Sequence, residues 1–217
     1  MRSRFDGELD RLNTELIEMG VLVETAIENA CRALTGRDAA LARETVAGDE
    51  AVNRKERQVE SLCLRLIWQQ QPVAGDLRLV SAAMKMITDM ERIGDQAQDI
   101  AEIALYVADA PDFRVPEDIA EMAKATAKMV HESVDAFVKR DLTLARAVQA
   151  ADDQVDAYFV RVKGELAALL TDRPGIASAA LDMLMIAKYF ERIGDHAVNI
   201  AEWVEFAMTG MYKGARL

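Results

Sequence analysis

Acidic side chains recur at helical spacing within one twelve-residue segment of the chain. Glu91, Asp95, Asp99 and Glu102 follow one another at intervals of four, four and three residues. On an α-helix these intervals place the four carboxylates on one face over about three turns. Hard cations prefer carboxylate oxygens, and neighbouring helices can share such ions. The spacing therefore indicates a candidate metal-binding face.

The same segment occurs a second time, 100 residues further along the chain. The stretches Glu91–Glu102 and Glu191–Glu202 agree at nine of twelve positions, and both begin with Glu-Arg-Ile-Gly-Asp. Agreement at this level indicates an internal duplication. The second copy contributes Glu191, Asp195 and Asn199 at the matching positions.

A pair of further candidate ligands precedes each copy. Asp49 and Asn53 are four residues apart, as are Asp152 and Asp156. Consecutive helices of a bundle pack along their lengths. We therefore expect each pair to face the acidic segment of its own half.

Like charges four residues apart destabilise a helix by roughly 0.2–0.5 kcal/mol per pair, so something should neutralise them. A bound cation is one candidate. The other is arginine, because Arg92 and Arg192 stand three residues before Asp95 and Asp195. In that alternative the segment is a solvated acidic face that ion pairs with arginine stabilise. The residues leave both interpretations open.

A glycine interrupts each copy of the motif. Gly94 and Gly194 lie inside predicted helices, where glycine costs about 1 kcal/mol relative to alanine. Their recurrence indicates close approach of another backbone or of a bound group. The copies also differ, because His196 replaces Gln96. His196 is either a metal ligand or a polar contact, and the two sites need not be equivalent.

The elements that position these residues are predicted to be helices. Hydrophobic residues make up 51% of the 217 residues, charged residues make up 29%, and there are only four prolines. Apolar residues recur at spacings of three and four. Six helices are predicted, at about 3–34, 38–70, 74–107, 117–139, 142–170 and 176–208. Gly36 is expected to be a left-handed C-terminal cap, and Asp38 and Asp141 are expected to be N-caps.

We therefore predict an all-α fold of two tandem antiparallel three-helix bundles, placed end to end or side by side. The first bundle would span 1–110 and the second 116–217, with the proline-containing stretch 110–116 between them. Trp68 and Trp203 stand near predicted helix ends and are interpreted as packing anchors.

Charge and cysteine content narrow the class of protein. The formal net charge is −11, and residues 1–108 and 109–217 carry −6 and −5 of it. Nucleic-acid phosphates repel such a surface, so no nucleic-acid partner is expected. Cys31 and Cys63 are interpreted as buried free thiols, which favours a reducing compartment. No signal peptide or membrane span is predicted, so we expect a cytoplasmic protein without direct membrane insertion.

Recognisable catalytic motifs are missing from the sequence. It has no Gly-rich phosphate loop, no Gly-x-Ser-x-Gly and no Glu-x-x-His pair, so no catalytic or cofactor-binding residue is assigned. The residues leave two classes of function open. One is a metal-dependent enzyme that uses a carboxylate cluster, and the other is a metal-free helical scaffold that binds basic partner surfaces.

The duplicated motif resembles that of the PhoU family of phosphate-signalling regulators. The resemblance rests on the two Glu-Arg-Ile-Gly-Asp copies, the Asn199–Glu202 stretch and the Gln71–Arg78 segment, and covers essentially the whole chain. It implies a non-enzymatic regulator that links a phosphate ABC transporter to a sensor histidine kinase. Such a regulator represses the starvation response when phosphate is plentiful. The transporter's ATPase subunit and the kinase are the implied partners, at the inner face of the membrane, and we expect a homodimer.

The resemblance also implies ligands for iron, zinc or magnesium. Carried over by position, the ligand candidates are Asp49, Asn53, Glu91, Asp95 and Asp99 in the first half and Asp152, Asp156, Glu191, Asp195 and Asn199 in the second. The two asparagines depart from the acidic pattern, because they offer an oxygen without a charge.

Overall fold

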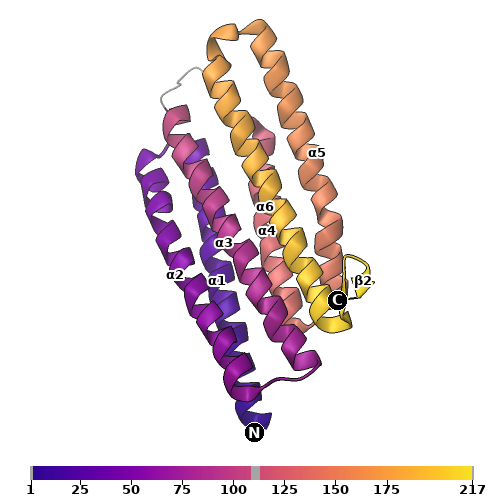
Figure 1. The fold of residues 1–217 in the computed structure, drawn as a ribbon. Coiled ribbons are helices and arrows are strands. Elements are labelled where there is room, and N and C mark those ends of the chain that lie inside the picture. The colour runs from indigo at the N-terminus through magenta and orange to yellow at the C-terminus, as the bar shows by residue number, and fades with distance from the viewer. Residues whose placement is uncertain (1, 109–112, 217) are drawn as a thin grey trace.

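Six long helices and a short C-terminal hairpin make up the computed structural model, which describes residues 2–108 and 113–216 (Figure 1). The elements are α1 (Arg2–Gly36), α2 (Ala39–Gln70), α3 (Gly75–Ala108), α4 (Glu117–Lys139), α5 (Leu142–Asp172), the 3₁₀ turn η1 (Pro174–Ile176), α6 (Ala177–Thr209), β1 (Met211–Tyr212) and β2 (Ala215–Arg216). The predicted all-α fold is confirmed. None of the helices in these ranges has the length and apolar character needed to cross a membrane.

The helices form two sets of three that lie side by side. Helices α1, α2 and α3 pack on one another, as do α4, α5 and α6. The two sets meet along α3 and α6, which form the most extensive helix pair in the molecule, and again along α1 and α4 (Figure 1). We call the α3–α6 contact the seam. It places the two copies of the duplicated motif on adjacent helices.

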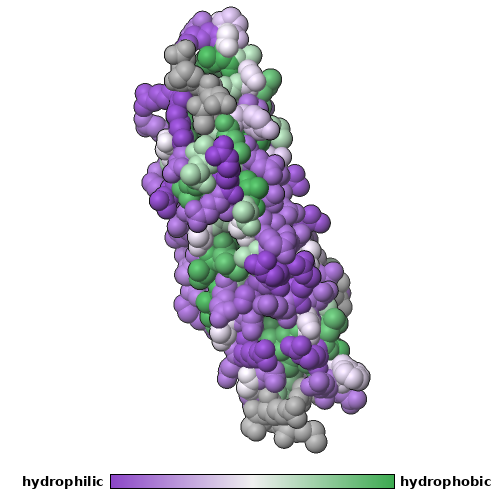
Figure 2. Space-filling model, turned by 90° about the vertical axis from the view of Figure 1, so that its left-hand side faces the viewer, coloured by the Kyte–Doolittle hydropathy of each residue, from purple (hydrophilic) through white to green (hydrophobic). Residues whose placement is uncertain are grey.

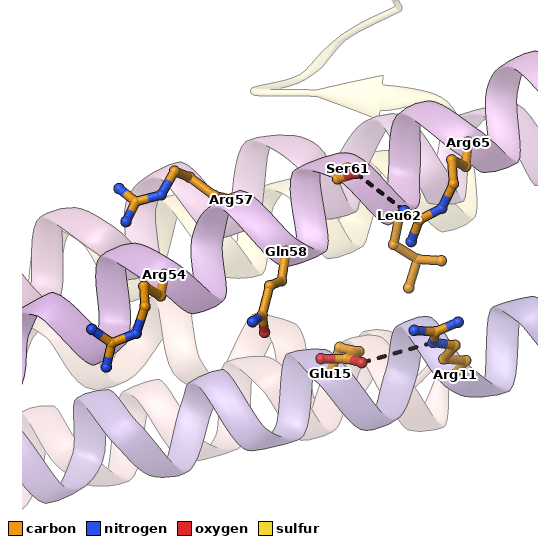
Figure 3. A pocket seen from close by; sticks show the side chains of 8 residues that line it. All are labelled: Arg11, Glu15, Arg54, Arg57, Gln58, Ser61, Leu62 and Arg65. Carbon is orange, nitrogen blue, oxygen red and sulfur yellow. Dashed lines mark hydrogen bonds and ion pairs between the residues drawn. The ribbon is translucent and has the colours of Figure 1, made fainter.

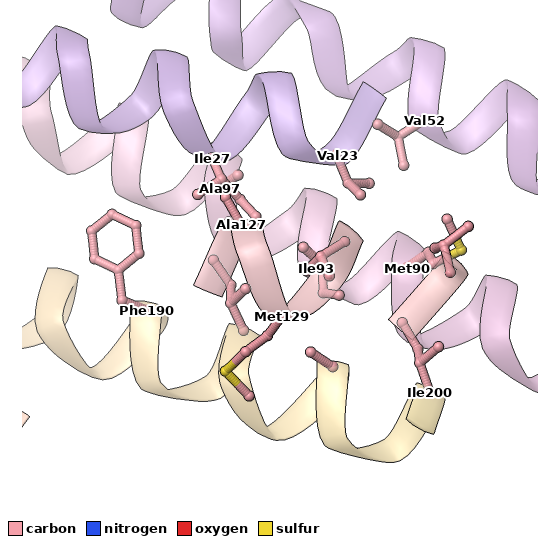
Figure 4. Packing of buried hydrophobic residues seen from close by; sticks show 14 of the residues in the cluster. Val23, Ile27, Val52, Met90, Ile93, Ala97, Ala127, Met129, Phe190 and Ile200 are labelled. Carbon is pink, nitrogen blue, oxygen red and sulfur yellow. The ribbon is translucent and has the colours of Figure 1, made fainter. Parts of the chain in front are cut away.

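One continuous apolar core runs through both sets. Buried side chains from α1, α3, α4 and α6 contribute to it, among them Ile27, Ile93, Met129 and Phe190 (Figure 4). Burial of an aliphatic or aromatic side chain contributes roughly 1.5–3 kcal/mol, so this shared core holds the halves together. The division into units at 1–110 and 116–217 remains a prediction. Of the predicted linker, residues 110–112 lie outside the described residues.

The turns after α1 and α4 have the same construction. Arg37 and Arg140 are both left-handed, with φ of 54°, and each is followed by an aspartate that caps the next helix. The amide of Asp38 donates to Ala33 O, and the amide of Asp141 donates to Ala136 O, each at 2.9 Å. This bonding satisfies the carbonyls at the end of a helix. The two predicted aspartate caps are thus confirmed.

The prediction for Gly36 was wrong. Gly36 is the last helical residue of α1, and the left-handed position falls on Arg37. Arg37 Nη2 donates to Phe113 O at 2.6 Å, and this contact helps to hold a conformation that side chains adopt at a cost of about 1–2 kcal/mol.

The two tryptophans differ in their surroundings. Trp203 of α6 stacks on Tyr212 of the hairpin with ring centroids 4.0 Å apart, so its interpretation as a packing anchor is confirmed. Trp68 of α2 is 80% exposed, so the same interpretation was wrong for it. Cys31 and Cys63 are buried free thiols as predicted, and burial raises their pKa values to about 11 and about 12.

Two acidic clusters and the seam between the halves

The first acidic cluster lies between α2 and α3 and comprises Asp49, Asn53, Glu91 and Asp95. Burial, followed by the nearby charge of Asp95, raises the pKa of both Asp49 and Glu91. The Asn53 amide donates to Asp49 Oδ2 at 2.5 Å. The other oxygen, Asp49 Oδ1, is buried without a hydrogen-bond partner among the described residues. The expected convergence of α2 and α3 carboxylates is thus present in this half.

The second acidic cluster lies between α5 and α6 and comprises Asp152, Asp156, Glu191 and Asp195. Burial and then the charges of Asp156, Asp195 and Glu191 raise the pKa of Asp152 to about 6. Asp152 Oδ1 is also buried without a hydrogen-bond partner in the described part of the chain. An aspartate stands here where the first cluster has Asn53, so this cluster contains one more carboxylate.

The motif glycines allow these aspartates to approach the neighbouring helix. A Cβ atom at Gly94 would lie 3.1 Å from Asp49 Oδ1 and 3.0 Å from Val52 Cγ1. A Cβ atom at Gly194 would lie 2.9 Å from Asp152 Oδ1. Real Cβ atoms essentially never come as close as the Gly194 distance, and the Gly94 distances are tighter than nine in ten real Cβ contacts. Each glycine therefore leaves the space that its partner aspartate occupies.

Basic side chains neutralise part of each cluster. Arg92 approaches Asp95 at 3.0 Å and Glu91 at 3.5 Å, as the arginine alternative predicts for the first half. In the second half the basic partner is Lys188, which forms an ion pair with Glu191. Within residues 2–108 and 113–216, no three side chains of His, Cys, Asp or Glu stand in an arrangement that could hold a metal ion.

The last candidate ligand of each half lies at the seam. Asn199 Nδ2 donates to Asp89 Oδ1 at 3.2 Å, and His196 Nδ1 lies 2.9 Å from the same oxygen. At the matching position of the other half, the Tyr189 hydroxyl interacts with the Asp99 carboxylate across the seam and counteracts part of the rise in the Asp99 pKa that burial causes. Positions 89 and 189 thus reach across the seam in the same way, and His196 makes a polar contact.

Sequence reasoning missed Asp89, Tyr189 and Lys188. These residues lie just before Glu91 and Glu191, outside the repeated motif. A comparison of the two halves at their offset of 100 residues shows Asp89 against Tyr189 and Thr88 against Lys188. These unlike pairs are the signal that could have identified them.

The sequence model of the PhoU domain family matches this chain twice, at residues 16–104 and 119–204. The chain belongs to the PhoU domain family. Each match contains one copy of the duplicated motif and one acidic cluster.

Proteins of similar sequence carry the same family name. The chain is 34% identical over 208 residues to the phosphate-specific transport system accessory protein PhoU homolog of Pseudomonas aeruginosa, with 95% of this chain and 86% of that protein covered. It is 36% identical over 207 residues to the homolog from Caulobacter vibrioides, with 95% and 90% covered.

Solved structures show the same fold. The crystal structure of PhoU from Pseudomonas aeruginosa superposes with a TM-score of 0.88 at 34% identity, and covers 95% of this chain and 100% of that chain. The phosphate transport system regulatory protein PhoU from Streptococcus pneumoniae superposes with a TM-score of 0.87 at 28% identity, with 95% and 98% covered. The side-by-side arrangement of six helices is therefore the family fold.

Proposed function

We propose that this protein regulates phosphate uptake and phosphate-starvation signalling by protein–protein contact. In this role it couples the ATPase subunit of a phosphate ABC transporter to a sensor histidine kinase. It acts as a negative regulator when phosphate is plentiful. The observation that carries the proposal is family membership over both halves, since relatives that align along nearly the whole chain are named accessory proteins of phosphate-specific transport.

A non-enzymatic role agrees with the chemistry of the two clusters. Catalysis at a carboxylate site needs a nucleophile or an acid/base pair placed beside it. Ion pairs with Arg92 and Lys188 engage Glu91, Asp95 and Glu191. The relatives are named accessory proteins rather than enzymes.

We further propose that each acidic cluster binds a metal ion. Carboxylate oxygens suit iron, zinc or magnesium, and one aspartate oxygen in each cluster is buried without a partner among the described residues. No three of the described side chains hold an ion as they stand, so binding would require them to move together. Asp49, Glu91 and Asp95 would hold the ion in the first half, and Asp152, Asp156, Glu191 and Asp195 in the second. Arg92 and Lys188 would have to turn away for these ligands to be free. A bound ion would neutralise the cluster and cross-link its two helices.

Asn53, Asp99 and Asn199 complete the candidate ligand sets. Asn53 is bonded to Asp49, while Asp99 and Asn199 are bonded across the seam. An ion that took Asp99 or Asn199 as a ligand would therefore link its cluster to the opposite half of the molecule.

The proposed partners determine where the protein works. We propose that it acts in the cytoplasm as a homodimer, at the inner face of the membrane, through its contacts with the transporter and the kinase. The net charge of −11 disfavours direct contact with nucleic acid.

A binding experiment with purified components tests the proposal. The chain is mixed with the transporter ATPase subunit, or with the cytoplasmic part of the kinase, from the same organism, and the mixtures are analysed by gel filtration and light scattering. We expect a complex with at least one partner at micromolar concentration. Separate elution of all components, with and without phosphate and divalent metal, would contradict contact-based regulation.

A further inference from the structure

An arginine-rich groove lies between α1 and α2. The groove has a volume of about 620 Å³. Its lining includes Arg11 and Glu15 from α1 and Arg54, Arg57 and Arg65 from α2 (Figure 3). Four guanidinium groups against one carboxylate is an unusual concentration of positive charge in a chain whose net charge is −11.

Carboxylates of the protein itself neutralise this groove incompletely. Arg54 and Arg57 share one exposed carboxylate, Glu50, at 3.6 and 3.3 Å. Arg65 donates to the neutral hydroxyl of Ser61 at 3.2 Å and has no carboxylate partner among the described residues.

At the other end of the groove, Arg11 has only a weak partner. Its Nε atom lies 3.8 Å from Glu15 Oε1, while Lys55 already binds Glu15 Oε2 at 2.9 Å. The guanidinium groups of Arg11 and Arg65 are turned toward each other across the groove (Figure 3). Two cations in this arrangement are stabilised by an anion between them.

The stripe of α2 that lines the groove continues onto an exposed aromatic residue. Gln58, Ser61 and Arg65 line the groove, and Trp68 follows three residues later on the same face. Trp68 is 80% exposed, and Leu64 beside it is 51% exposed. The side of the molecule that includes α2 shows hydrophilic and hydrophobic residues interspersed along its length (Figure 2). Tryptophan and arginine are the residues most enriched at the energetic centres of protein–protein interfaces.

We propose that this groove and Trp68 form a docking surface for an acidic helical segment of a partner protein. Arg54 and Arg65 are eleven residues apart, about 16 Å along the helix, so one inorganic phosphate cannot reach both. Carboxylates spaced over three turns of a partner helix can pair with arginines along the groove, and guanidinium groups bind carboxylates through two parallel hydrogen bonds. An apolar residue one turn further along would cover Trp68.

A flat anionic bilayer fits this surface less well. The arginines line a concave groove between two helices, which a planar surface cannot enter, and the net charge of −11 repels anionic lipid. The inference rests on the proposed function only in assuming that the protein acts through protein contacts. To the proposed function it adds the surface of this protein that binds a partner and the negative charge of the partner segment.

Fluorescence anisotropy with a designed probe tests the docking surface. The probe is a labelled helical peptide with four glutamates spread over about 16 Å and a leucine one turn later. A second peptide with glutamines in place of the glutamates controls for charge. The variants are Arg11→Gln/Arg65→Gln and Trp68→Ala. The matched control is Arg43→Gln/Lys163→Gln, which removes two exposed charges outside the groove. Phosphate and vesicles containing phosphatidylglycerol are tested in parallel.

We expect the acidic peptide to bind the wild-type chain. Its Kd should weaken at least tenfold in Arg11→Gln/Arg65→Gln and severalfold in Trp68→Ala, and should stay unchanged in the control variant. No binding of the acidic peptide would overturn the proposal, as would equal loss in the control variant. Groove-dependent binding of phosphate or vesicles but not of the peptide would also overturn it. Because the assay needs no transporter or kinase, its failure would leave the proposed regulatory function standing.

Discussion

Asp89 of α3 and His196 of α6 are joined across the seam, with His196 Nδ1 2.9 Å from Asp89 Oδ1. Their side chains are only 15% and 18% exposed. Asn199 donates to the same oxygen, so three polar groups meet where the two halves pack most closely. The equivalent contact across the seam in the other half is between Tyr189 and Asp99. The two halves are thus linked by related but chemically different contacts.

The first prediction concerns the energy of this link. A double-mutant cycle of Asp89→Ala and His196→Ala should give a coupling free energy of about 1 kcal/mol. Asp89→Ala removes the partner of the partly buried His196, and His196→Ala leaves Asp89 with Asn199 alone at this oxygen. The measurement is urea unfolding of the four proteins. A parallel cycle on the exposed Glu121–Lys124 pair should give only a few tenths of a kcal/mol. Equal coupling in the two cycles would contradict a structural role for the seam contact.

The second prediction concerns the motif glycines. Gly94→Ala should lower the free energy of unfolding by about 1 kcal/mol, because the clash with the stiff Val52 side chain outweighs the gain in helix propensity. Gly194→Ala should be nearly neutral, since the close atom there belongs to the Asp152 carboxylate, which can turn aside.

Gly48→Ala is the matched control for these glycines. A Cβ atom at Gly48, which lies within α2, would meet nothing within 4 Å. This change should stabilise the protein by up to about 1 kcal/mol, measured by the same urea unfolding. Stabilisation of similar size by Gly94→Ala would show that the glycine is not needed for close packing.

The third prediction concerns Asp152 and pH in metal-free protein. Burial and neighbouring carboxylates raise the folded pKa of Asp152 to about 6, above its ordinary value of 3.8. Between these values the folded state binds more proton than the unfolded state, so this group lowers stability as pH rises. Asp152→Asn should therefore stabilise the protein by about 1 kcal/mol at pH 7, after allowance for solvent screening. The difference should vanish as pH falls to 4.

Chemical unfolding at several pH values measures this difference. Glu165→Gln, an exposed change on the same helix, should shift stability by less than about 0.5 kcal/mol at every pH. If Asp152→Asn destabilises the chelator-treated protein at pH 7, the Asp152 carboxylate is not held in an unfavourable charged state.

The fourth prediction concerns metal content. Protein prepared without chelator should retain iron, zinc or magnesium. Each of two double variants, Asp49→Asn/Asp95→Asn and Asp152→Asn/Asp195→Asn, should lose the metal that is bound at the altered cluster. Elemental analysis after gel filtration gives the ratio of metal to protein. The second cluster should hold its metal more tightly, because a carboxylate replaces the neutral Asn53 there.

A charge-matched control accompanies the metal analysis. Asp6→Asn/Asp10→Asn removes two exposed carboxylates from α1 and should leave metal content unchanged. If the wild-type protein and the control variant retain no more metal than the cluster variants, the metal-free scaffold is the correct alternative.

Much of the fold could be predicted from the sequence because its signals are local. Apolar spacing indicated the six helices, and the aspartate caps were identified from their own side chains. The left-handed position after α1 was not, because it falls on Arg37 rather than on the neighbouring Gly36, which glycine's conformational freedom favours. The C-terminal hairpin was also missed. Its Tyr212 stacks on Trp203 of α6, a contact between a helix and a strand that helical spacing does not indicate.

The candidate site could be predicted only in part. Helical spacing identified Glu91 and Asp95 together with Asp49, because these residues share two adjacent helices. Spacing alone could not show that Asp99 and Asn199 interact with residues across the seam, since the packing of α3 on α6 is a tertiary property. Nor could it show that Trp68 stays exposed, because apolar character alone predicts burial.

Expression of phosphate-starvation genes in excess phosphate tests the regulatory function most directly. The measurement compares a reporter for such a gene in the wild-type strain, in a strain lacking this protein and any paralogue, and in that strain with the gene restored. We predict high expression in the deletion strain and repression after restoration. Full repression in the deletion strain, despite excess phosphate and no paralogue, would contradict negative regulation by this protein.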